Sequence, residues 1–148
     1  MPNYYTLGLN FLHSDSSACL FRNNVLLAAS EEERFTRVKH TSNFPVNSIN
    51  YCLQQANISI SEIDLVTINT NPFSGIIKKF FFVITHLSSI KIAVFSLINA
   101  RKKITLSKLL SKIDNKKKFK GKIKFVDHHE AHIASSLLFS KFSKCANL

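Results

Sequence analysis

The pattern of apolar and polar residues predicts three β-strands at the start of the chain. Apolar and polar residues alternate over 5–11, and short apolar runs follow at 17–21 and 25–29, which are patterns typical of strands. The polar segment at residues 22–24 separates the second and third of these runs and is typical of a hairpin turn. The chain is therefore expected to open with a three-strand antiparallel meander.

The pattern then changes to the period of an α-helix. Pro45 suits the first turn of a helix, and apolar residues recur after it at helical spacing as far as Asn57. Residues 59–63 are expected to form a short helical turn or loop, and the β-branched run at residues 65–69 predicts a fourth strand.

The second half of the chain continues with helices and one more strand. Residues 74–113 place basic side chains between apolar clusters, which indicates two or more amphipathic helices. A charged loop at 114–121 and a strand at 123–126 lead into a helix from about residue 129 to 139. This order of elements predicts an α/β domain with a mixed sheet over residues 1–148.

Composition favours one globular domain, since 45% of the 148 residues are hydrophobic and 20% are charged. The three cysteines form no C-x-x-C pair, which favours reduced thiols. The start of the chain lacks the pattern of a signal peptide, so a cytoplasmic protein is expected. Lys91 divides the apolar stretch at 80–100, which is therefore expected to form buried or interfacial helices and not a membrane span.

The net charge of +11 comes mainly from lysines in the second half of the chain. Such a field can attract nucleic acid or an anionic membrane. However, Phe119 and Phe125 are the only aromatic residues in the basic stretch, and nucleic-acid sites use more aromatic residues and more arginine. We expect a solvated surface and no nucleic-acid partner.

The densest group of candidate ligands is the segment Asp127-His128-His129-Glu130-Ala131-His132. His128 and His132 are four residues apart and would share one helix face, so their ring nitrogens could converge on a metal ion. The segment is not an H-E-x-x-H protease motif. The alternative is an ordinary helix N-terminus, capped by Asp127 and with Glu130 in the first turn. The spacing alone leaves both possibilities open.

A second candidate is the loop at residues 31–40, which follows the third predicted strand. It carries Arg34, Arg37, Lys39 and His40, at a strand end where α/β proteins commonly bind ligands. Arginine and lysine suit an anionic group such as phosphate. The alternative is a solvated loop whose opposite charges pair locally.

A third candidate is the turn between the first two strands, where His13 and Asp15 are close in sequence. A histidine beside a carboxylate can perform acid-base chemistry. The alternative is a turn in which serine and aspartate bond the backbone.

Taken together and in order, these segments resemble the N-terminal domain of the ATP-dependent O-carbamoyltransferases, a family that includes nodulation-factor, cephalosporin and tobramycin carbamoyltransferases. The resemblance implies a ribonuclease-H-like, actin-like ATPase fold. Family members transfer a carbamoyl group from carbamoyl phosphate, through carbamoyl-adenylate made with ATP by a separate C-terminal domain, to a hydroxyl of a small molecule or sugar. The matching segments are residues 8–10, 13–19, 31–40, 43–45, 51–53 and 126–132.

The resemblance also implies roles for particular residues. His128 and His132 match the family's metal-binding H-x-x-x-H, with Fe(II) the expected ion, which would act as a Lewis acid on the carbamoyl carbonyl. Lys39, with Arg34 and Arg37, matches the basic loop that would hold phosphate or adenylate oxygens.

Asp15 matches the acid of the family's His-Asp pair and would orient or deprotonate the acceptor hydroxyl. The pair is adjacent in the family, whereas Ser14 separates His13 from Asp15 here. The family's third metal ligand, an aspartate in an Asp-Gly strand, is expected past Leu148.

Two functions follow as expectations. In the first, the chain is a fragment or split subunit of a carbamoyltransferase, without a membrane span and inactive alone. In the second, it is a non-catalytic binding or interaction module that retains part of the fold.

Overall fold

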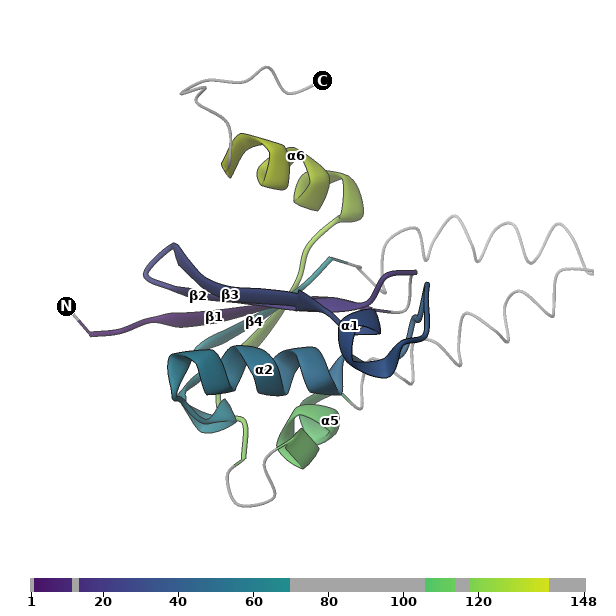
Figure 1. The fold of residues 1–148 in the computed structure, drawn as a ribbon. Helices are drawn as coiled ribbons and strands as arrows, with labels where there is room; N and C mark the ends of the chain where they lie inside the picture. Colours follow the sequence, from purple (N-terminus) through teal and green to yellow (C-terminus); the bar gives the residue numbers. More distant parts are fainter. Residues whose placement is uncertain (1, 12–13, 70–105, 114–117, 139–148) are drawn as a thin grey trace, which may run out of the picture.

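The computed structural model describes residues 2–11, 14–69, 106–113 and 118–138. They form a five-stranded mixed sheet with helices, which confirms the expected α/β class. In Figure 1, α2 and α5 lie against one face of the sheet and α6 lies over the other.

The strand order is β3-β2-β1-β4-β5. β2 pairs antiparallel with both β1 and β3, whereas β4 pairs parallel with β1 and β5 pairs parallel with β4. β1, β3, β4 and β5 therefore run in one direction, and their carboxyl ends lie at one edge of the sheet. The strand bounds are β1 Tyr5–Asn10, β2 Ser17–Arg22, β3 Val25–Glu31, β4 Leu65–Ile68 and β5 Lys122–Phe125.

The helices differ from the expectation at two points. α6 begins at His128, one residue earlier than expected, and a short helix, α1, occupies part of the segment that was expected to be a loop. α5 is the described part of the expected helical region, whose remainder, including residues 80–100, lies outside the described residues. The bounds are α1 Glu33–Thr36, α2 Val46–Ala56, η1 Ile60–Glu62, α5 Leu106–Ile113 and α6 His128–Leu138.

The hydrophobic core fills the layer between the sheet and the pair α2 and α5. Leu7, Leu20, Ile49 and Leu110 each have no exposed surface. Burying one such side chain stabilises the fold by about 1.5–3 kcal/mol. This layer buries the face of the sheet opposite α6 (Figure 1). Among the described helices, none has the length and apolarity needed to span a membrane.

β5 is fixed to the rest of the sheet by a close backbone approach at Gly121. A Cβ atom at this position would lie 2.6 Å from the Asp64 carbonyl oxygen, so only glycine fits without a shift of the backbone. The next residue, Lys122, donates its N–H to that same oxygen at 2.8 Å. These contacts fix the start of β5 beside β4.

Candidate functional site

The carboxyl edge of the sheet gathers the candidate groups from four strands. The turn with Asp15 follows β1, the loop at 32–41 follows β3, Asn69 follows β4 and α6 follows β5. Ligands of α/β sheets bind at the carboxyl ends of the strands. Segments far apart in the sequence therefore follow strands that end at the edge where a ligand is expected.

His128 and His132 bring their ring nitrogens together on α6. Their Nε2 atoms are 3.1 Å apart and the ring planes are nearly perpendicular, at 86°. Two imidazole nitrogens bound to one ion at about 2.1 Å are about 3.0–3.4 Å apart, so this donor pair fits a divalent metal. Among the described residues, no group of three or more His, Cys, Asp and Glu side chains could hold a metal ion.

The same helix start has the ordinary cap that was the alternative to a metal site. Asp127 Oδ1 accepts a hydrogen bond from the His129 N–H at 3.0 Å. This bond satisfies one of the first N–H groups of the helix. The cap and the converging histidines coexist, because they use different residues of the first turns.

The basic side chains of the loop after β3 are exposed. Arg34, Arg37 and Lys39 all face solvent. The one described ion pair among them joins Arg34 Nε to Glu31 Oε2 at 3.9 Å, and an exposed pair of this length contributes little to stability. The three cations are therefore accessible to an anionic ligand.

The base of this loop is fixed by Glu32, a residue to which the sequence analysis assigned no role. Its side chain is only 3% exposed. The carboxylate accepts four hydrogen bonds of 2.8–3.2 Å, from the backbone N–H and side chains of Asn47 and Ser48. Because Pro45 gives α2 no side-chain cap, Glu32 supplies the negative charge at this helix N-terminus.

Within the described residues, Asp15 has a histidine partner that the sequence did not indicate, His40. Asp15 Oδ1 lies 2.9 Å from His40 Nδ1. His13 lies outside the described residues, so its expected role stays a prediction. The sequence shows His40 only as part of the basic segment, because a contact across 25 residues leaves no local pattern.

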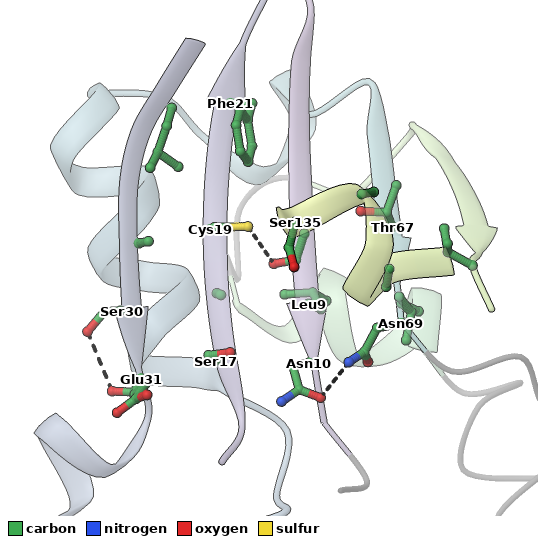
Figure 2. A pocket seen from close by; sticks show the side chains of 18 of the residues that line it. Leu9, Asn10, Ser17, Cys19, Phe21, Ser30, Glu31, Thr67, Asn69 and Ser135 are labelled. Atoms are coloured by element: carbon green, nitrogen blue, oxygen red, sulfur yellow. Dashed lines mark hydrogen bonds between the residues drawn. The ribbon is translucent and has the colours of Figure 1, made fainter. Parts of the chain in front are cut away.

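A cavity of about 890 Å³ lies between the sheet and α6. At its polar end, Asn69 Nδ2 donates to Asn10 Oδ1 at 2.9 Å, close to Ser17 and Glu31 (Figure 2). Arg34 also lines the cavity, whereas Arg37 and Lys39 do not. The volume lies within the usual range for small-molecule sites, about 300–1,000 Å³.

The thiol in this cavity is not an activated nucleophile. Burial raises the pKa of Cys19, and the weak hydrogen bond from its Sγ to the Gly8 carbonyl at 3.8 Å opposes this effect only in part. Because the thiolate is the reactive form of cysteine, a raised pKa leaves the group as a neutral wall of the cavity.

Comparison with known proteins confirms the family suggested by the sequence motifs. A family model described as carbamoyltransferase N-terminus matches residues 5–148. An uncharacterised protein of Synechocystis is 34% identical over 97% of this chain, and nodulation protein NolNO of Sinorhizobium fredii is 31% identical over 96% of it. The chain spans 25% and 20% of the lengths of these two relatives.

Proposed function

Because the chain belongs to the carbamoyltransferase N-terminus family, we propose that it forms part of the site where a carbamoyl group passes from a phosphate-activated donor to a hydroxyl acceptor. The observation that carries this proposal is that a basic loop, an Asp-His pair and two converging histidines all follow strands that end at one edge of the sheet. Transfer of a carbamoyl group needs the same three elements: anion binding, proton removal and polarisation of a carbonyl.

The strand order supports the ribonuclease-H-like assignment within this proposal. In that fold the first three strands form an antiparallel meander and the following strands add in parallel beside the first. The order β3-β2-β1-β4-β5 with β2 reversed fits this scheme.

The donor's phosphate is proposed to bind the loop after β3. Arg34, Arg37 and Lys39 are exposed there, and Arg34 also lines the cavity. Guanidinium and ammonium groups form strong charge-assisted hydrogen bonds with phosphate oxygens. The donor is carbamoyl phosphate or carbamoyl-adenylate, and the cavity has room for either one.

The metal is proposed to bind His128 and His132, whose nitrogens have the separation that a shared ion requires. When bound, a divalent ion such as Fe(II) supplies Lewis-acid polarisation of the carbamoyl carbonyl. The remaining steps are assigned to the chain's own residues. The basic loop holds the anionic leaving group, and Asp15, with its histidine partner, orients or deprotonates the acceptor hydroxyl.

The ATP-dependent step is proposed to belong to other parts of the enzyme. The two relatives are several times longer than this chain, so most of such a protein is not represented by these residues. We therefore expect the isolated chain to bind the donor without turning it over with ATP. The second candidate, a non-catalytic module, predicts no specific binding of the donor.

The test is calorimetric titration of carbamoyl phosphate into the chain, a double variant Arg34→Ala/Lys39→Ala and a control Lys118→Ala/Lys120→Ala. The control removes the same charge from exposed lysines elsewhere. Each lost charge-assisted hydrogen bond is worth about 1.5–3 kcal/mol, so the first double variant should bind at least about tenfold more weakly than the wild type. Equal weakening by both double variants, or no binding at all, would contradict the proposed function.

A further inference from the structure

The contact between Asp15 and His40 is formed by two exposed side chains. The two side chains are 52% and 76% exposed, and exposed pairs on flexible side chains usually contribute less than about 1 kcal/mol. The observed 2.9 Å contact therefore depends on how the backbone places the two residues.

The backbone of both residues is held in an uncommon conformation. Asp15 and His40 have φ values of 67° and 53°, in the left-handed region that non-glycine residues rarely adopt. Asn10 Nδ2 donates to the Asp15 carbonyl oxygen at 2.8 Å and fixes the turn on one side. Residues in such conformations persist where the surrounding structure determines them, and they cluster at functional sites.

Ser16 closes the loop that carries His40. Its N–H donates to the Thr41 carbonyl oxygen at 3.0 Å, and its own carbonyl oxygen accepts the Glu32 N–H at 2.8 Å. Ser16 has no exposed surface, and Glu32 is itself bonded to the start of α2. Both ends of the loop at 32–41 are thus bonded to the residue next to Asp15, which sets the separation of the two side chains.

In this arrangement the second ring nitrogen of His40, Nε2, is available to a ligand. In the neutral imidazole, a carboxylate at Nδ1 favours the tautomer with the proton on that atom, which leaves Nε2 as the acceptor. Within the part of the chain that the structure describes, His40 bonds through Nδ1 and its Nε2 makes no hydrogen bond. The ring is mostly exposed, so a substrate can reach this nitrogen.

Resting on the proposed function, we propose that His40, oriented by Asp15, is the base that accepts the proton of the acceptor hydroxyl. The hydroxyl oxygen forms a bond to the carbamoyl carbon while its proton passes to His40 Nε2. The bond from that carbon to the phosphate or adenylate oxygen breaks, and the leaving group departs with the electron pair. The imidazolium then returns the proton to solvent. Asp15 acts through His40 as a positioning residue.

The test uses diethyl pyrocarbonate, which acylates unprotonated imidazole nitrogens, with the rate at each histidine followed by mass spectrometry. We expect His40 to react faster than His129, which is exposed on α6. In Asp15→Asn, the amide can donate to Nδ1 and favour the tautomer with the proton on Nε2, and asparagine tolerates positive φ. The His40 rate should then fall several-fold while the His129 rate is unchanged. Equal His40 rates in the two proteins would overturn the proposal.

A second arm separates this inference from the proposed function. Carbamoyl phosphate at saturation, judged by calorimetry, should slow the acylation of His40 several-fold and leave His129 unaffected. Binding of carbamoyl phosphate without protection of His40 would overturn the inference alone. Failure of carbamoyl phosphate to bind at all would overturn the proposed function, and with it the inference.

Discussion

At the scale of single residues, the sequence could not distinguish the three consecutive glutamates at 31–33. Glu31 is exposed, whereas Glu32 is buried and bonded to the N-terminus of α2. The difference arises from a contact with residues 15 and 16 positions away. Strand periodicity predicts which face a side chain takes, but it does not predict a partner on another element.

Replacing Glu32 by alanine should destabilise the fold strongly. The change would leave donors of Asn47 and Ser48 without their acceptor in a buried place, at a cost of about 2 kcal/mol or more. Glu31→Ala is the matched control and should change the free energy of unfolding by less than about 0.5 kcal/mol. Urea denaturation of both variants measures this, and equal stabilities would show that Glu32 does not fix the loop.

Cys52 gives a prediction about pH. Burial raises the pKa of this thiol to about 12, whereas an unfolded cysteine ionises near about 8.5. Above that pH the folded chain keeps a proton that the unfolded chain releases, so the stabilisation present at lower pH is lost progressively as the pH rises towards 12. The difference in unfolding free energy between the wild type and Cys52→Ala should therefore shrink from pH 8 to pH 10.5. A constant difference would refute the assignment.

At the scale of elements, local patterns predicted most of the described helices and strands. Alternation identified β1, short apolar or β-branched runs identified β2 to β4, and helical spacing identified α2, because α2 buries a single face. The sequence pattern did not predict α1, since four residues are too few to show a helical period. The Asp15–His40 contact could not be predicted for a different reason. It joins two loops, and the hydrogen bonds between these loops are made by backbone atoms.

We expect α6 to bind a metal ion through two of its three histidines. Fe(II) or Zn(II) titrated calorimetrically should bind the wild type and the control His129→Ala alike, since the His129 ring lies apart, with its centroid 6.1 Å from that of His128. The double variant His128→Ala/His132→Ala should lose this binding, because both converging nitrogens are removed. Indistinguishable binding by the double variant and the control would remove the metal assignment.

At the scale of the whole molecule, the direction of the strands explains why distant motifs lie at one edge of the sheet. Parallel pairing of β1, β4 and β5, with β3 in the same direction, brings the segments after all four strands to one edge. The sequence predicted the segments and the class of fold, and the family resemblance predicted their common purpose. The distances between side chains from different segments depend on tertiary contacts such as those of Ser16 and Glu32.

The basic loop and the histidine pair are proposed to contact the same bound ligand. This central claim is tested most directly by measuring the Kd of carbamoyl phosphate for the chain with and without saturating Zn(II). If the bound donor contacts both groups, the metal should tighten its binding by about fivefold or more, and reciprocally. His128→Ala/His132→Ala, titrated in the same buffers, controls for binding of Zn(II) to the donor in solution and should show no such tightening. The same Kd for the metal-free and metal-loaded wild type would contradict the account.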